Sequence, residues 1–219
     1  MKHTFYFLLI IILVGLTNCE NDSKEPSIIF PNRIGTKWKY DNSVTHDTTL
    51  WEIIGKETVD NKSCIIIRSN LINSNVYVDK YYYVNSDGVM LVAEKLPKGS
   101  SPSFDLTYRQ DDTLYIYKNS NYLFKSTKVI GYSWDYFSAI FASDGLLSTE
   151  FVEIKTIKKI IAQERITLPI GQFDCSIVQW DGYSCQEYYS EEGLVLVQTK
   201  SVIGLDTIEV EQRLIDFKN

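Results

Sequence analysis

Residues 49–68 read TLWEIIGKETVDNKSCIIIR, in which two runs rich in β-branched and apolar residues flank Asp60-Asn61. Asp and Asn tolerate positive φ at the centre of a tight turn, so this stretch predicts a β-hairpin. The neighbouring sequence follows a period of two rather than 3.6, which is the pattern of strands. The fold class is therefore one of strands joined by short turns.

Three further pairs of runs repeat this pattern along the chain. They are residues 77–84 and 89–94 around 85–88, residues 173–180 and 183–189 around Asp181-Gly182, and residues 194–199 and 208–217 around Gly204. Residues 114–124 and 151–161 predict additional strands. Consecutive hairpins favour an antiparallel meander, so we predict a mainly β protein with a single curved antiparallel sheet and little helix.

One stretch departs from this pattern, because its apolar residues follow a helical spacing. Trp134, Phe137, Ile140 and Phe141 fit one helical face, and Ser133 suits a cap. We expect either a short helix or a loop there. Residues 95–105 contain Pro97, Gly99 and Pro102 and predict a surface loop.

The N-terminus predicts an export signal. Lys2 precedes FYFLLIIILVGL at residues 5–16, an uncharged run of twelve residues that is shorter than the ~20 needed to cross a bilayer. Leu16-Thr17-Asn18-Cys19 follows and resembles the bacterial lipobox. The resemblance implies cleavage before Cys19 and acylation of that residue, which anchors the protein in a membrane. Ordinary signal-peptidase cleavage and an uncleaved anchor are the alternatives.

These signals divide the chain into three parts. Residues 1–18 are the predicted signal peptide, residues 19–27 an acidic flexible tether after the lipidated Cys19, and residues 28–219 a single β domain. Acidic residues directly after a lipidated cysteine resemble the export signals of surface lipoproteins in some Gram-negative bacteria. The expected location is the cell envelope, anchored in the outer membrane and exposed at the surface.

The composition narrows the classes of partner. The 219 residues are 44% apolar, which suffices for a core, and the net charge of −6 comes without any basic block. This pattern argues against nucleic acid and against an anionic membrane surface as a partner. The oligomeric state stays open.

Three short stretches resemble a group of uncharacterised bacterial secreted and lipidated proteins related to the DUF3108 and TapB-like families. They are residues 30–40 (FPNRIGTKWKY), residues 168–175 (LPIGQFDC) and residues 188–195 (YYSEEGLV). The resemblance implies an open half-barrel sheet like that of periplasmic lipoprotein carriers. It implies no catalytic residues.

Motifs for chemistry are scarce. No fingerprint for a hydrolase, a zinc protease or a nucleotide-binding enzyme is present, so we expect no enzyme, no cofactor and no metal. His46 fits a solvated loop better than a general base, and the pairs Asp111-Asp112 and Glu191-Glu192 fit solvated turns. A two-residue turn at Asp181-Gly182 would pair Val178 with Cys185 and put Cys175 and Cys185 on opposite faces. Buried apolar thiols are preferred, with a bridge from Cys64 to Cys175 or Cys185 left open.

Clustered tyrosines are the remaining candidates for a site. Tyr81, Tyr83, Tyr115, Tyr117 and Tyr188 could line a ligand groove, because each ring joins an apolar body to a polar tip. An ordinary sheet surface explains the same residues. The leading hypothesis is an envelope lipoprotein that holds an apolar or amphipathic, lipid-like ligand on the concave face of its sheet. The alternative is a surface-exposed structural or protein-interaction module without a small-molecule ligand.

Overall fold

The computed structural model describes residues 30–71, 77–96, 113–143, 149–203 and 206–219, and all regular structure in these ranges is β-strand. The strands are β1 (Lys37–Asn42), β2 (Thr48–Val59), β3 (Lys62–Leu71), β4 (Tyr77–Asn85), β5 (Gly88–Leu96), β6 (Thr113–Lys125), β7 (Ser133–Ser143), β8 (Thr149–Leu168), β9 (Gly171–Trp180), β10 (Cys185–Ser190), β11 (Gly193–Ile203) and β12 (Asp206–Lys218). The prediction of a mainly β protein is confirmed.

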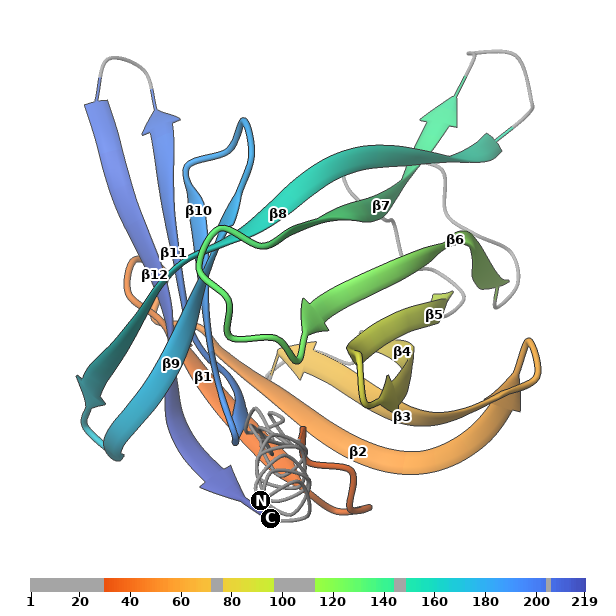
Figure 1. Ribbon diagram of the computed structural model, residues 1–219, viewed down its shortest axis with the longest axis horizontal. Helices are drawn as coiled ribbons and strands as arrows, with labels where there is room; N and C mark the ends of the chain where they lie inside the picture. The colour runs from red at the N-terminus through yellow and green to blue at the C-terminus, as the bar shows by residue number, and fades with distance from the viewer. Residues whose placement is uncertain (1–29, 72–76, 97–112, 144–148, 204–205) are drawn as a thin grey trace, which may run out of the picture.

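The described strands form one antiparallel sheet in the order β6-β5-β4-β3-β2-β1-β12-β11-β10-β9-β8-β7. The described strands therefore begin with β1 in the middle of the sheet and run outward to β6. They continue at the far edge with β7 and return to β12 beside β1. The sheet curls until its two edges, β6 and β7, approach each other (Figure 1). It is more nearly closed than the open half-barrel that the resemblance implies.

Local turn chemistry explains the predicted hairpins. Asp60 and Asn61 have φ values of 48° and 58° and join β2 to β3, with Val59 paired to Lys62. Asn85 pairs with Gly88 and its side chain accepts hydrogen bonds from the N–H groups of Asp87 and Gly88. Both turns set the register of the strands beside them, which confirms these two hairpins.

The β9–β10 hairpin forms, but the predicted register is wrong by two residues. Val178 pairs with Glu187 rather than with Cys185, because four residues, 181–184, connect the strands instead of two. The Tyr183 N–H bonds to the Trp180 carbonyl and closes this wider turn. A shift by two preserves the side on which each residue lies, so Cys175 and Cys185 still occupy opposite faces.

The helix or loop expected near Trp134 is also wrong, because these residues form β7. This strand pairs with β8 along its whole length, from Ser133 opposite Lys159 to Ser143 opposite Thr149. The helical spacing of Trp134 and Phe137 arises because the two rings lie on opposite faces of a strand. Pairing with the long strand β8 overrides that local pattern.

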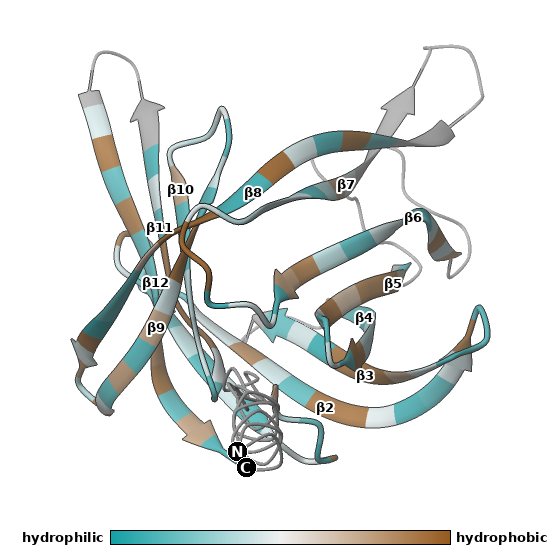
Figure 2. Cartoon of the chain, viewed as in Figure 1, coloured by the Kyte–Doolittle hydropathy of each residue, from teal (hydrophilic) through white to brown (hydrophobic). Residues whose placement is uncertain are grey.

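The register carries one face of the sheet from strand to strand, and we call it the inner face. It bears Tyr40, Ile53, Ile67, Tyr82 and Leu214. The rings of Phe124 on β6 and Tyr189 on β10 stack at 4.6 Å between centroids, although these strands are not neighbours in the sheet. The inner face is therefore concave and its side chains meet across the interior. Figure 2 shows the alternation of hydrophobic and hydrophilic residues along the strands that form it.

The motifs that carry the family resemblance have structural roles here. Trp38 and Tyr40 enter the core from β1, where the Trp38 Nε1–H donates to the Glu192 carbonyl at 2.6 Å and the Tyr40 hydroxyl donates to the Leu194 carbonyl at 2.9 Å. Gly193 has φ of +102°, and a Cβ atom there would lie 3.2 Å from the Phe30 ring. The positive φ, together with the close approach of the Phe30 ring, favours glycine at this turn.

Candidate functional site

The most unusual group on the inner face is a buried lysine on β8. The side chain of Lys158 is 0% exposed, and its Nζ lies 2.7 Å from Oε2 of Glu187 on β10. The same amine donates to the Leu123 carbonyl of β6 at 3.1 Å. A period of two along β8 puts Lys158 on the same face as Thr156 and Ile160, which fixes its inward direction.

Aromatic rings surround this ion pair. The Lys158 Nζ lies 4.1 Å from the ring centroid of Tyr136 and 4.5 Å from that of Trp180. The Tyr189 hydroxyl donates to Glu187 Oε2 at 3.0 Å. Burial lowers the pKa of Lys158, and the Glu187 carboxylate opposes that effect. Carboxylate, ring faces and carbonyl together replace the water that the ammonium group has lost.

A second ion pair lies on the same face. Lys80 on β4 lies 3.5 Å from Oε1 of Glu94 on β5, and the Tyr117 hydroxyl donates to the same oxygen at 2.9 Å. Burial raises the pKa of Tyr82, and the charges of Glu94 and Glu187 raise it further. The carboxylates of the two ion pairs, Glu94 on β5 and Glu187 on β10, therefore both raise the pKa of the same tyrosine. Each lysine of the two pairs has a carboxylate beside it, which offsets part of the cost of burying the charge.

The five tyrosines predicted to line a groove do not share one surface. Tyr115 and Tyr117 contact the inner cluster, whereas Tyr81 and Tyr83 pack with Cys64 on the opposite, outer face. Tyr188 pairs with Ile177 and Leu196, on the face opposite to Glu187, and its hydroxyl donates to Gln198 Oε1 at 2.7 Å. Their role in ligand binding stays a prediction.

The other predicted site residues fall in several places. Cys64 and Cys175 are buried and Cys185 is half-buried, and all three described thiols are free, so Cys64 bridges neither partner. Burial, with smaller contributions from Glu192 and Asp174, raises the pKa of Cys175 to about 12. His46 is exposed in the β1–β2 turn. Cys19 and the pair Asp111-Asp112 lie outside the described residues.

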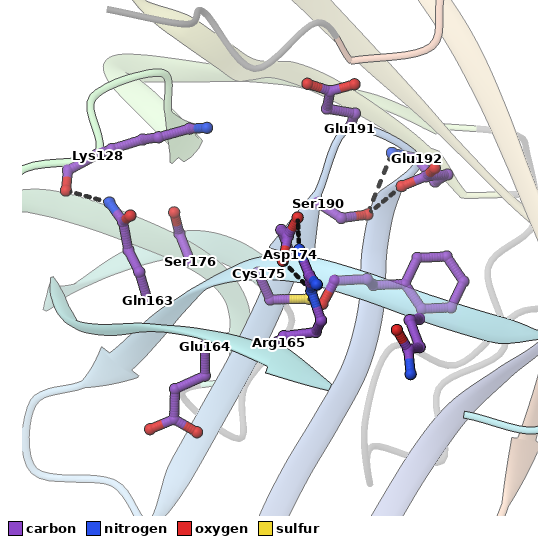
Figure 3. Close-up of a pocket in the computed structure, with 12 residues that line it drawn as sticks. Lys128, Gln163, Glu164, Arg165, Asp174, Cys175, Ser176, Ser190, Glu191 and Glu192 are labelled. Carbon is purple, nitrogen blue, oxygen red and sulfur yellow. Dashed lines mark hydrogen bonds and ion pairs between the residues drawn. The ribbon is translucent and has the colours of Figure 1, made fainter. Parts of the chain in front are cut away.

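An outer cleft of about 580 Å³ lies beside the β10–β11 turn (Figure 3). Arg165 and Asp174 pair in it through two hydrogen bonds of 2.7 and 3.0 Å, and the Ser190 hydroxyl donates to Glu192 at 2.7 Å. Gln163 donates to the Lys128 carbonyl. Charges of both signs line the cleft and several already bind one another. Among the described residues, no group of acidic, cysteine or histidine side chains is arranged to hold a metal ion.

Sequence reasoning missed Lys158 and Glu187. Lys158 stands in the run Lys155-Thr156-Ile157-Lys158-Lys159, where isoleucines occur on both faces and the inward face has no clear signature. Glu187 likewise stands between Gln186 and Tyr188 without a distinctive spacing. Only the pairing of β7, β8, β9 and β10 brings the two residues together.

Comparisons with known proteins are sparse. No family model matches the chain, and no curated protein matches it as a relative. Among solved structures, the chain aligns with a candidate lipoprotein from Parabacteroides distasonis ATCC 8503, at 15% identity and a TM-score of 0.45, over 88% of this chain and 99% of that one. A likeness at that score does not identify a role for this chain. Membership of the DUF3108 and TapB-like group stays a prediction. In the ranges that the structure describes, no helix has the length and apolar character of a membrane span.

Proposed function

We propose that the protein is a lipid-anchored, non-enzymatic component of the cell envelope whose β body acts as a structural or protein-interaction module. The anchor rests on Lys2, the apolar run 5–16 and Leu16-Thr17-Asn18-Cys19, a sequence order that favours acylation of Cys19. The acidic residues Glu20 and Asp22 next to that cysteine favour the outer membrane and its exposed surface as the location.

The observation that favours a module over a ligand carrier is the close packing of large side chains on much of the inner face. Large side chains that are less than 2% exposed gather there, among them Trp38, Tyr40, Ile53, Phe124, Lys158 and Tyr189, whereas the Lys80 side chain is 36% exposed. A site for a small apolar ligand is typically a mostly apolar cavity of about 300–1,000 Å³. An apolar or amphipathic ligand on the concave face would have to displace packed rings and a paired lysine. This packing favours a protein that contacts its partners through its outer surface rather than through its concave face.

Native mass spectrometry of the full-length protein, purified from membranes in mild detergent, tests both parts. We expect a chain that begins at Cys19 and carries acyl groups, without a retained fatty acid or phospholipid adduct. An adduct that survives desalting and is lost on denaturation would contradict the close packing of the inner face. An unmodified Cys19 or a retained leader would contradict the anchor, and Cys19→Ala supplies the control without acylation.

Protein contacts are tested separately, by crosslinking on intact cells. We expect the acylated protein to form the same crosslinked species repeatedly, and Cys19→Ala to lose them because the body leaves the membrane surface. A protein that forms no crosslinked species in its own membrane would contradict the module.

A further inference from the structure

The connection between β6 and β7 ends in an apolar turn. Residues 129–132 read Val-Ile-Gly-Tyr, and the Tyr132 N–H bonds to the Val129 carbonyl at 3.1 Å. Gly131 has φ of +93° at the third position, which is the geometry of a type II turn. Val129 is 52%, Ile130 62% and Tyr132 41% exposed. Three large apolar side chains therefore project outward from four residues.

This turn is fastened to β8 rather than loosely attached. The Gly131 N–H bonds to the Ile160 carbonyl at 2.8 Å, and the Ile160 N–H bonds to the Tyr132 carbonyl at 3.0 Å. Gln163 holds the Lys128 carbonyl on the other side of the turn. These bonds hold the backbone of the turn against β8 in the conformation that exposes Val129 and Ile130. Figure 2 shows a hydrophobic stretch within this connection.

The turn and the start of the β domain border two adjoining clefts. Lys128 lines the outer cleft of Figure 3 together with Glu191 and Glu192. The same two glutamates line the adjacent cleft, whose other wall contains Phe30 and Pro31. Two adjoining clefts thus separate the apolar turn from Phe30, the residue at which the described chain begins.

The length of the chain between Cys19 and Phe30 limits how far the β domain can lie from a bilayer that holds Cys19. Ten residues, 20–29, join Cys19 to Phe30, and a fully extended chain of that length spans at most about 35 Å. If Cys19 carries the anchor, the bilayer stays within that distance of Phe30. Such a short tether gives the turn a high effective concentration at the lipid surface, so a weak apolar contact suffices.

We propose that the turn at residues 129–132 inserts into the interface of the bilayer that holds the acyl chains of Cys19, and that it sets the orientation of the β body on the membrane. The inference rests on the proposed anchor. Val129 and Ile130 suit the boundary with the acyl chains, and Tyr132 suits the headgroup layer, where its ring and hydroxyl meet different surroundings. Lys128 and the nearby Glu191 and Glu192 have opposite charges, so the contact depends on apolar insertion and not on anionic lipid.

Quenching by brominated lipids tests the contact in the lipidated full-length protein. The protein is reconstituted into phosphatidylcholine vesicles with bromine on the upper acyl carbons, and Ile130→Trp is compared with Val44→Trp. Val44 is 47% exposed in the β1–β2 turn and is a matched aliphatic control. The fluorescence added to the background of the native tryptophans should be quenched several-fold more for Ile130→Trp than for Val44→Trp.

Flotation of the same vesicles distinguishes a failure of the Cys19 anchor from a failure of the turn to insert. If the protein floats and the two variants are quenched equally, the turn does not insert, although the anchor stands; a protein partner or a second copy would then be the occupant. If the wild-type protein does not float, the anchor fails and the membrane contact of the turn fails with it. Insertion is supported only when flotation is accompanied by preferential quenching at position 130.

Discussion

The sheet contains two junctions of different kinds. At the first, β1 and β12 lie at opposite ends of the described chain and yet share a regular ladder, from Lys37 opposite Lys218 to Asn42 opposite Gln212, with one bulge. At the second, β6 and β7 follow each other in the chain but form the two edges of the sheet. At these two junctions, unlike in the hairpins, nearness in sequence does not determine which strands pair.

Side chains take the place of the ladder at the second junction. The Asn121 amide donates to the Phe137 carbonyl at 2.6 Å and accepts from the Phe137 N–H at 2.9 Å, so it imitates a neighbouring strand. The Trp134 Nε1–H donates to the Tyr122 carbonyl at 2.8 Å, and Lys158 reaches Leu123. We call this group the β6–β7 seam. Curling the sheet thus leaves unpaired backbone groups on its two edge strands, and a few side chains form hydrogen bonds with some of them.

The largest effect is expected at the buried ion pair beside the seam. Glu187→Leu leaves the Lys158 ammonium without its carboxylate and should destabilise the protein by about 3–5 kcal/mol. The double variant Lys158→Met/Glu187→Leu should recover most of that loss, because apolar side chains pack well among Tyr136, Trp180 and Tyr189. Denaturant unfolding of both single variants and the double variant measures the coupling. Additive losses would show that the pair is not coupled.

An intermediate effect is expected at Asn121. Asn121→Leu removes the partner of the N–H and carbonyl of Phe137 in a half-buried position, which should cost about 2 kcal/mol. Asn42→Ala is the matched control at the other junction, where the side chain accepts from the exposed N–H groups of Val44 and Thr45. Its unfolding free energy should change by less than about 1 kcal/mol. Equal losses in the two variants would remove the distinction between the junctions.

The smallest effect concerns pH. Burial tends to raise the pKa of Glu153, but hydrogen bonds from the Lys118 N–H, the Asn119 amide and the Tyr115 hydroxyl outweigh it and hold that pKa below its ordinary value. The carboxylate therefore stabilises the fold fully above the unfolded pKa of about 4.3, and this contribution is lost as pH falls through the lower folded value.

Glu153→Gln provides the measurement of that contribution. The variant should be less stable than the wild-type protein at pH 7 by up to about 1 kcal/mol, and the gap should close below about pH 4. Urea unfolding at a series of pH values follows the difference. A gap that stays constant to pH 3, or that widens in acid, would show that Glu153 does not link β8 to β6 through its charge.

Much of the fold was predictable because hairpins are local. Asp60-Asn61 and the Asn85–Gly88 turn carry their own conformational preferences, and each determines the register of two strands. The pairing of β1 with β12 has no such local signal, and neither has the conversion of the Trp134 region into a strand. The candidate site was less predictable still, since Lys158 and Glu187 come from separate strands and acquire a shared environment only after the sheet has curled.

Native-state hydrogen exchange of the full-length protein tests the contrast between the junctions most directly. We predict that the Phe137 amide and its neighbours on the β7 side of the seam exchange through local opening, well before the paired amides of β1 and β12, and that Asn121→Leu accelerates the former without changing the latter. Equal protection at both junctions, or a response to Asn121→Leu spread evenly over β1 and β12, would contradict a sheet that is closed by backbone pairing at one junction and by side chains at the other.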